Sequence, residues 1–335
     1  MRQVIIIAEA GVNHNGDVEI AKRMIQAAAE AGVDYVKFQT FKASSLVSAD
    51  AKKAAYQQRN CPGMGDTQMQ MLRSLELKPE DFAALKTECE RCGVGFLSSP
   101  FDEESVGLLA DLGMDYWKIP SGEITNLPYL RCVGAMGGKV ILSTGMSMLS
   151  EIEAAVEAIE KAGTPRCDIT LLHCNTQYPT PMEDVNLLAM NELANMGCEA
   201  VGYSDHTLGI AVPVAAAALG ASVIEKHFTL DKSLPGPDHK ASLEPLELKA
   251  MVDAIRDVEK ALGVPCKQVS RSERDNIAVA RKSIVAAKPI KAGDLFASCN
   301  ITAKRPGNGL SPMLWDEVIG TVAKRDFCTD EQIEL

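Results

Sequence analysis

Eight short apolar runs, each followed by a helical stretch, are the feature of this sequence that most constrains its fold. Most runs are apolar over several consecutive residues, which is typical of strands buried on both faces. A repeated strand–helix unit over about 260 residues predicts an α/β fold, the closed (β/α)8 TIM barrel. A doubly wound open sheet is the alternative, but no Gly-rich dinucleotide fingerprint follows the first run. The runs cover residues 4–10, 34–40, 93–101, 115–123, 139–146, 168–174, 200–206 and 222–230.

Start and stop signals delimit the predicted helices. Pro79 fits a first helical turn, and Gly93 fits the end of the same helix. Ser150 and Glu153 have the spacing of a capping box, and Gly163 would close that helix. The connection 41–78 is unusually long. Because long loops are often functional, we interpret it as a partly ordered lid over the barrel.

The strand–helix pattern stops near residue 265. Residues 266–280 are polar and charged, and short β runs with turns and little helical periodicity follow them. We therefore expect a catalytic barrel at 1–265, a linker at 266–280 and a small β-rich domain at 281–335. A chain of 335 residues is also longer than one hydrophobic core usually serves.

Composition excludes several classes of partner. The net charge of -11 disfavours nucleic acid and anionic membranes, since binding to phosphates needs a basic surface. No stretch has the roughly 18 apolar residues of a membrane span, and the N-terminus lacks the pattern of a signal peptide. The ten cysteines have no framework spacing, and the CxxC pair Cys89 and Cys92 lacks a second pair to complete a zinc site. We expect a cytoplasmic protein with reduced thiols.

Polar residues end all eight predicted strands. This matters because active sites of (β/α)8 barrels lie at the carboxyl ends of the strands. Strands that meet solvent often end in polar residues, but the convergence of two lysines and several histidines needs a further reason. The strand-end residues are Glu9, Lys37, Ser98, Ser99, Lys118, Ser121, Glu123, Ser143, His173, Asn175, Tyr178, Ser204, His206, Glu225 and His227.

Two histidines and two lysines carry the candidate chemistry. His206 and His227 end neighbouring strands, where two imidazoles can share one divalent metal ion; two hydrogen-bonded core histidines are the alternative. Lys37 and Lys118 lie inside apolar strands, and a buried lysine needs an anionic partner. That partner is a phosphate or carboxylate ligand, or a glutamate in a structural ion pair. A Schiff-base lysine stays open as a third reading.

Two loops add candidate binding residues. The run LPGPDH after the eighth strand has two prolines, which make a rigid turn that could direct Asp238 inward. In the small domain, the run KRPGNG places Arg305 beside Pro and Gly. This arginine could bind a hydroxylated or anionic ligand, or simply cap a turn.

Taken together, these runs resemble the sialic acid synthases over nearly the whole chain. Nine runs match in the same order, which is a highly specific signal. They are EAGVNHNG (9–16), KFQT (37–40), KIPSGE (118–123), LSTGM (142–146), YPTP (178–181), SDHT (204–207), EKHFT (225–229), PGPD (235–238) and KRPGNG (304–309).

The resemblance implies an enzyme, a transferase that condenses phosphoenolpyruvate with an N-acylated mannosamine-type sugar. It implies a C-terminal domain similar to type III antifreeze proteins (SAF domain), and Mn²⁺ or Mg²⁺ on His206 and His227. The enzymes of the family look like domain-swapped homodimers in which an arginine, here Arg305, reaches the partner's site. The implied catalytic residues are Glu9, Lys37, Lys118 and Glu123. Phosphoenolpyruvate would be held by Lys37, Ser99, Lys118, Ser121, Ser143 and Ser204. The sugar would be held by Glu9, Glu123, Tyr178, Glu225, Asp238 and Arg305.

A few positions depart from the best-known N-acetylneuraminate synthases. Position 99 is Ser instead of Thr, Phe38 replaces His, and residues 175–177 read NTQ. These departures resemble the legionaminic acid synthases, whose sugar has a second acetamido group and lacks one hydroxyl. The acceptor is therefore either N-acetylmannosamine or 2,4-diacetamido-2,4,6-trideoxymannose. The enzymatic rivals are a phosphoenolpyruvate-dependent synthase of phosphorylated sugars and a Schiff-base aldolase, and the non-enzymatic rival is a sugar-binding or ice-binding module.

Overall fold

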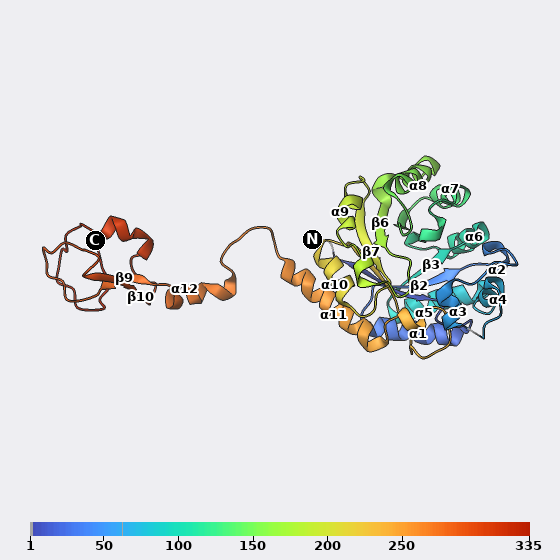
Figure 1. Ribbon diagram of the computed structural model, residues 1–335, viewed down its shortest axis with the longest axis horizontal. Coiled ribbons are helices and arrows are strands. Elements are labelled where there is room, and N and C mark those ends of the chain that lie inside the picture. Colours follow the sequence, from blue (N-terminus) through green and yellow to red (C-terminus); the bar gives the residue numbers. More distant parts are fainter. Residues whose placement is uncertain (1–2, 62) are drawn as a thin grey trace. The chain divides into compact units, whose positions relative to one another are not determined.

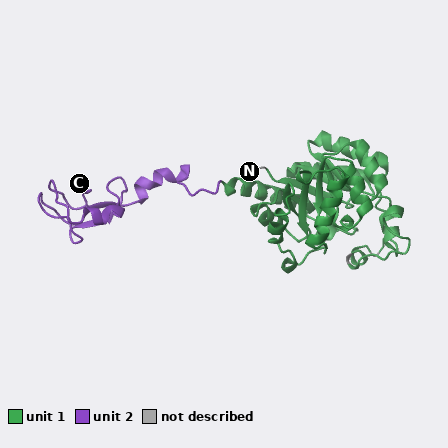
Figure 2. Ribbon diagram, turned by 90° about the horizontal axis from the view of Figure 1, so that it is seen from above, with its two compact units in different colours: residues 1–263 green, residues 264–335 purple. Residues whose placement is uncertain are grey.

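The protein forms two compact units in a computed structural model that describes residues 3–61 and 63–335 (Figures 1 and 2). The first unit is Met1–Gly263 and the second is Val264–Leu335. In the described part of the chain, no helix is long and apolar enough to cross a membrane.

Eight parallel strands form the centre of the first unit. They are hydrogen-bonded in the order β3-β2-β1-β8-β7-β6-β5-β4, and β3 also adjoins β4, so the sheet closes into the predicted barrel (Figure 1). The strand expected at 115–123 is shorter than predicted, because Pro120 follows Ile119 and residues 121–123 form a 3-10 turn. The strands are β1 (Ile5–Gly11), β2 (Tyr35–Thr40), β3 (Gly95–Pro100), β4 (Tyr116–Ile119), β5 (Lys139–Ser143), β6 (Ile169–Cys174), β7 (Ala200–Asp205) and β8 (Val223–His227).

Helices surround the strands and bury their apolar faces against them (Figure 1). Pro79 and Gly93 delimit a helix as predicted, and Gly93 has the left-handed φ of 73° that favours glycine. The predicted capping box at Ser150 is wrong: the helix starts two residues earlier, where Glu151 accepts the N–H of Met148. The helices are α1 (Val18–Ala31), α5 (Pro79–Cys92), α6 (Glu103–Leu112), α7 (Leu127–Ala135), α8 (Leu149–Ala162), α9 (Ala189–Ala194), α10 (Ala211–Ala218) and α11 (Pro245–Leu262).

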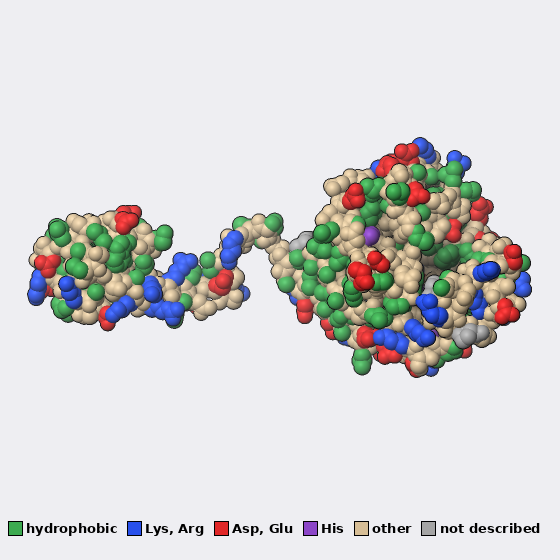
Figure 3. All heavy atoms as spheres, viewed as in Figure 1, with side chains coloured by type: hydrophobic (Ala, Val, Ile, Leu, Met, Phe, Trp, Pro, Cys, Tyr) green, Lys and Arg blue, Asp and Glu red, His purple; other side chains and the backbone are tan. Residues whose placement is uncertain are grey.

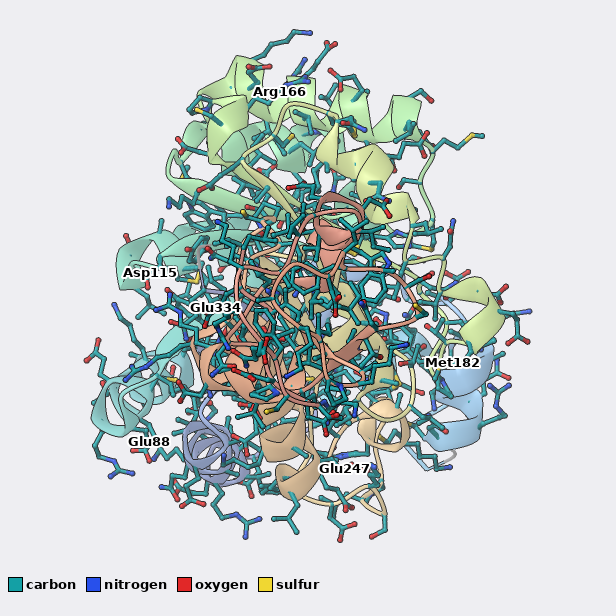
Figure 4. All side chains as sticks on the ribbon, turned by 90° about the vertical axis from the view of Figure 1, so that its left-hand side faces the viewer. Glu88, Asp115, Arg166, Met182, Glu247 and Glu334 are labelled. Carbon is teal, nitrogen blue, oxygen red and sulfur yellow. The ribbon has the colours of Figure 1, made fainter. Side chains whose placement is uncertain are left out.

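Ion pairs on these helices are partly exposed. Arg166 pairs with Glu153, and Lys232 with Glu247, at N–O distances of 2.5 Å each. Figure 4 shows Glu88, Arg166 and Glu247 on the outer ring of the barrel, where such pairs contribute little to stability. Ion pairs inside the barrel, by contrast, are buried.

The barrel interior is built in layers, because side chains two residues apart on a strand point to the same side. Its lower layer is an apolar cluster separate from the core between strands and helices. Gly202 belongs to this level: a Cβ there would lie 2.4 Å from the Val223 carbonyl oxygen and 2.6 Å from Leu172 Cδ2. The fully buried members of the layer are Ile7, Leu97, Ile141, Leu172 and Val223.

The long connection after β2 contains short helices that were not predicted from the sequence. It contains three short helices, α2 (Ala43–Leu46), α3 (Ala55–Asn60) and α4 (Gln68–Arg73). Its apolar residues form a buried cluster together with Val12, which follows β1. Asn60 Nδ2 donates to the Pro237 carbonyl at 2.7 Å, so this connection contacts the loop after β8. The cluster consists of Val12, Phe41, Ala43, Cys61, Met69, Met71, Leu72 and Leu75.

The second unit is small and mostly irregular. It begins with exposed residues that include several cations, visible in Figure 3, and with α12 (Arg274–Ala280), a helix inside the expected linker. An antiparallel pair, β9 (Ser283–Ala286) and β10 (Ile301–Lys304), and the short helix α13 (Trp315–Val318) follow. Its core is made of Ile284, Ala286, Ile290, Phe296, Ile301, Val318, Ala323, Phe327 and Ile333.

Candidate active site

Two lysines and two glutamates form a buried ionic cluster directly above the apolar layer. Each lies two residues after a side chain of the lower interior: Glu9 after Ile7 on β1, for example, and Glu225 after Val223 on β8. Lys37 Nζ lies 2.5 Å from Glu9 Oε2 and 3.7 Å from Glu225 Oε2. Lys118 Nζ lies 3.6 Å from Glu225 Oε1. Glu225 therefore bridges the two lysines.

Serine hydroxyls surround the ionic cluster. Lys37 Nζ donates to Ser99 Oγ at 3.1 Å, and Lys118 Nζ donates to Ser143 Oγ at 2.7 Å. Ser204 Oγ donates to Glu225 Oε1 at 3.1 Å. The site thus places ammonium and hydroxyl donors from β2 to β5 and from β7 around one point, which is the arrangement that an anionic ligand requires.

Burial and mutual contact determine the charges of these groups. Burial raises the pKa of Glu9 despite the opposing effect of Lys37. Burial alone would lower the pKa of Lys37, but Glu225 and Glu9 outweigh it and raise the pKa above its ordinary value. Burial lowers the pKa of Lys118, which Glu225 only partly offsets. For Glu225, the two lysines outweigh burial and lower the pKa, so this carboxylate is ionised.

His206 and His227 meet above the ionic cluster, as the strand ends predicted. Their ring centroids are 5.5 Å apart. The Nδ1 of His206 is 2.5 Å from the Asn175 carbonyl, which makes Nδ1 the protonated nitrogen and Nε2 the acceptor, 3.0 Å from Tyr178 Oη. Burial lowers the pKa of His206 to about 4 and that of His227 well below its ordinary value, so both rings are neutral.

These two neutral imidazoles fit a divalent metal ion. Among the described residues, the buried Nδ1 of His227 has no hydrogen-bond partner, so a ring nitrogen is available to a ligand. Gly11 has a φ of 54°, and a Cβ there would lie 3.2 Å from Glu9 Oε1 and 3.3 Å from His227 Cε1. Within the described chain, no group of three or more His, Cys, Asp and Glu side chains is arranged to hold an ion. Two protein ligands would leave the other positions to substrate and water.

The remaining candidate residues of the barrel lie at the rim of the same site. Glu123 lies in the 3-10 turn after β4 and accepts from Asn126 Nδ2 at 2.6 Å. Asp238 is buried in the loop after β8, and burial together with nearby Glu9 raises its pKa to about 7. Ser121 Oγ accepts the N–H of Gly145 at 3.0 Å.

The thirteen barrel residues that the family resemblance assigns to the site line one cavity of about 590 Å³, a size typical of small-molecule sites, whereas Ser98, His173 and Asn175 do not line it. The cavity has a polar floor at the strand ends and an apolar wall from the connection after β2. The wall consists of Phe41, Leu46, Val47, Met71, Leu72 and Leu75.

Arg305 belongs to the second unit, in a tightly built loop. Its Nε donates to the Ala280 carbonyl at 2.9 Å, while its two terminal nitrogens have no partner within the described residues. Gly307 is required here, because a Cβ would lie 2.5 Å from Arg281 Cβ. The loop thus holds an exposed guanidinium group whose terminal nitrogens can donate further hydrogen bonds.

Sequence reasoning missed several residues of the site. Gln39 Nε2 donates to Glu9 Oε1 at 3.1 Å, and the period-2 alternation from Lys37 would have placed it on the same face. Cys174 Sγ lies 3.2 Å from Ser121 Oγ, two residues after Leu172 on β6. The apolar wall had no comparable signal, since its residues come from a connection without strand periodicity.

The fold and the site together are those of a (β/α)8-barrel enzyme, with paired lysines and glutamates and two histidines in one cavity at the carboxyl end of the barrel. The model of the NeuB family matches residues 24–267, and the model of the SAF domain matches residues 281–334. The chain belongs to the NeuB family. This membership confirms the resemblance to sialic acid synthases, the barrel followed by a SAF domain, and the expectation of an enzyme that is a synthase.

The relatives cover the chain almost completely. An N,N'-diacetyllegionaminic acid synthase of Campylobacter jejuni is 52% identical over 333 residues, 99% of each chain. A second enzyme of this name, from Legionella pneumophila, is 46% identical and covers 94% of this chain and 89% of its own. The crystal structure of an N-acetylneuraminic acid synthetase from Leptospira borgpetersenii, in complex with citrate, is 35% identical. It has a TM-score of 0.70 and covers 82% of this chain and 90% of that one.

Proposed function

We propose that this enzyme condenses phosphoenolpyruvate with 2,4-diacetamido-2,4,6-trideoxymannose to give a nine-carbon 2-keto sugar acid and phosphate. The observation that carries the proposal is the buried cluster of Lys37, Lys118, Glu9 and Glu225, with its serine hydroxyls, directly below two neutral imidazoles in one cavity. The cluster offers donors for a phosphate and a carboxylate. The imidazoles offer ligands for a metal ion that would bind the sugar aldehyde.

The lysines and serines would hold phosphoenolpyruvate. Lys37 with Ser99 and Lys118 with Ser143 form two ammonium–hydroxyl pairs on opposite sides of Glu225. One pair suits the phosphate and the other the carboxylate of the substrate. Because these donors are fixed by the strands and shielded from water, they also stabilise negative charge as the reaction proceeds.

The reaction needs one carbon–carbon bond and one carbon–oxygen cleavage. The methylene carbon of phosphoenolpyruvate attacks the aldehyde carbon of the open-chain sugar, and water adds to the positive charge that develops at C2. The tetrahedral intermediate then loses phosphate. Glu9, Glu123 and Asp238 are carboxyl groups of the same cavity that can orient the sugar and the water and accept the proton.

His206 and His227 would hold a divalent ion, Mn²⁺ or Mg²⁺. When bound, it supplies Lewis-acid polarisation of the aldehyde oxygen. Tyr178 contacts both rings, with its ring centroid 4.1 Å from that of His206 and 5.6 Å from that of His227. It would orient the two ligands and border the sugar.

Two observations support the diacetamido sugar as the acceptor. The relatives that are 52% and 46% identical are both N,N'-diacetyllegionaminic acid synthases. The apolar wall of the cavity also suits a sugar with a methyl group in place of a hydroxymethyl group and with two acetyl methyl groups. One methyl group in such a site discriminates by about 10- to 200-fold.

The assembly and location of the enzyme are part of the same proposal. We propose a homodimer in which Arg305 of one chain completes the sugar site of the other. The free donors of this guanidinium and its rigid loop support such a role. Use of phosphoenolpyruvate, a glycolytic intermediate, supports a cytoplasmic location for the reaction.

Phosphate release tests the proposal directly. The purified chain is incubated with phosphoenolpyruvate and Mn²⁺, with N-acetylmannosamine and 2,4-diacetamido-2,4,6-trideoxymannose offered separately, with and without EDTA. We expect release that EDTA abolishes, with a kcat/KM at least tenfold higher for the diacetamido sugar. His227→Ala is expected to lose this metal-dependent activity while remaining folded by circular dichroism.

Other outcomes would point to the rival reactions. Phosphate release only with a phosphorylated sugar would show that the acceptor is a phosphorylated sugar. No release with any sugar would disprove the synthase function. A covalent adduct formed with pyruvate and borohydride would indicate a Schiff-base lysine instead. Full activity of His227→Ala would disprove the metal site.

A further inference from the structure

The two histidines of the site follow a fully buried ion pair that faces the opposite side of the sheet. Asp205 on β7 and Lys226 on β8 are direct partners in the strand ladder, and each immediately precedes a histidine. Side chains alternate along a strand, so this pair points outward to the helices while His206 and His227 point into the barrel. Both charged side chains are completely shielded from water.

Lys226 makes two contacts at the end of β7, one with its last residue and one just beyond it. Its Nζ donates to Asp205 Oδ2 and to the carbonyl of Thr207. Thr207 in turn donates from its N–H to Asp205 Oδ1 at 3.1 Å and from its hydroxyl to Asp205 Oδ2 at 3.0 Å. The lysine of one strand therefore binds the side chain of the residue before His206 and the backbone carbonyl of the residue after it.

This contact lies where the ladder between the two strands ends. The pairing of β7 with β8 stops at Asp205 and Lys226, one residue before the histidines. Beyond it, His206 is attached to the β6 side: its ring contacts the Asn175 carbonyl, and its carbonyl accepts from Thr180. The carbonyl of His227 accepts from Leu243 instead. Each histidine is thus anchored to a different neighbour.

We propose that Asp205 and Lys226 are positioning residues that set the distance between the two metal-binding imidazoles. A buried ion pair is not justified by stability alone, because an apolar pair of similar volume is often as stable or more so. A metal ion tolerates only small errors in ligand spacing, and partners behind the ligands commonly change metal affinity by about 10- to 100-fold. This inference rests on the metal site of the proposed function.

Metal binding by the full-length, metal-free protein tests the proposal without any turnover. The key variant combines Asp205→Asn with Lys226→Met, which removes both charges while keeping an oxygen acceptor for the Thr207 N–H. We expect Mn²⁺ affinity, measured by isothermal titration calorimetry, to fall about 10- to 100-fold. The thermal midpoint should stay within a few degrees of that of the wild type. Wild-type Mn²⁺ affinity in this folded variant would overturn the proposal.

A second variant decides the question if the first does not fold. Asp205→Asn with Lys226→Gln keeps a neutral hydrogen-bonded link between the strands, but the shorter side chain must draw them closer. We expect a smaller but measurable loss of Mn²⁺ affinity, and an unchanged affinity would count against the idea.

Two further variants separate positioning from other effects. The ion pair between Asp34 and Arg256, 2.8 Å long, joins α11 to the opposite end of the barrel. Asp34→Asn with Arg256→Met should reduce stability without changing Mn²⁺ affinity. If His227→Ala itself retains wild-type Mn²⁺ affinity, the metal assignment fails. If His227→Ala loses Mn²⁺ binding while the Asp205/Lys226 variants bind Mn²⁺ normally, only the positioning role of Asp205 and Lys226 is disproved.

Discussion

Two adjacent layers of the barrel interior show how one set of strands serves two purposes. The lower layer contains Ile7 and Val223, and the layer two residues higher contains Glu9 and Glu225 on the same strands. Both layers are buried, and both are held by the same strand ladder. They differ only in side-chain chemistry. The lower layer gains free energy by removing apolar surface from water, whereas the upper layer needs compensating charges to be buried at all.

The comparison supports the binding role that we propose for the upper layer. Its two lysines and two glutamates compensate one another, with Glu225 shared between both lysines. An anionic ligand would bring negative charge to the same donors. These hydrogen-bond donors are therefore preorganised for ligand binding. Changes in the upper layer should therefore affect catalysis, and changes in the lower layer should affect stability.

The largest expected effect is on catalysis, from Lys118→Met. The change removes the ammonium group that contacts Ser143 and Glu225 and leaves a buried carboxylate with one partner fewer. We expect kcat/KM for phosphoenolpyruvate to fall by about 10³-fold, the range for loss of one fixed electrostatic donor. Steady-state phosphate release measures it. Lys139→Met is the matched control, since this lysine starts β5 at the other end of the barrel and should leave kcat/KM unchanged. A loss below tenfold for Lys118→Met would contradict the assignment.

The next largest effect should be on stability, from Leu172→Ala in the lower layer. Leu172 is fully buried against Gly202, so truncation leaves a cavity and is expected to cost about 2–5 kcal/mol in the free energy of unfolding. Urea denaturation measures this change. The kcat of the folded variant should stay within about threefold of that of the wild type, since no charge or donor is lost. A stable variant with a large loss of kcat would show that the two layers do not divide the roles.

Period-2 and strand–helix patterns made the barrel predictable, and with it the residues at the strand ends. Lys37, Lys118, His206 and His227 lie together because parallel strands end on one face, which follows from topology without coordinates. The apolar wall was not predictable, because its position depends on how a connection without periodicity packs on itself. The bridging by Glu225 was also not predictable, since side-chain distances of 3.6 and 3.7 Å depend on strand stagger.

A smaller, pH-dependent effect is expected from Asp238→Asn. Burial and nearby Glu9 raise the pKa of Asp238 from 3.8 to about 7. Because the pKa is raised, the folded protein holds this proton more tightly than the unfolded chain does. The resulting contribution to the free energy of unfolding is fully present below pH 3.8 and is lost as pH rises through about 7. The asparagine variant stays neutral. Its free energy of unfolding, relative to that of the wild type, should therefore rise by about 2–3 kcal/mol between pH 5 and pH 8.

Urea denaturation of the metal-free protein at the two pH values measures this gain. The matched control is Asp231→Asn, an exposed position in the same connection whose pKa is lowered by hydrogen bonds from Ser233. That variant should show no gain between pH 5 and pH 8. Equal behaviour of the two variants would mean that Asp238 titrates like a surface residue.

The smallest expected effect is that of Arg305→Ala, and it extends the comparison to the second unit. Arg305 is exposed and contributes nothing to either layer, so its proposed role is confined to the sugar. We expect the KM for the sugar to rise about tenfold, equivalent to about 1.4 kcal/mol, as for one charged hydrogen bond, while the KM for phosphoenolpyruvate stays unchanged. Lys324→Ala, another exposed cation of this unit, should change neither constant. Because the ionic cluster holds phosphoenolpyruvate in this scheme, a parallel rise in both constants for Arg305→Ala would mean that the arginine acts on the whole site.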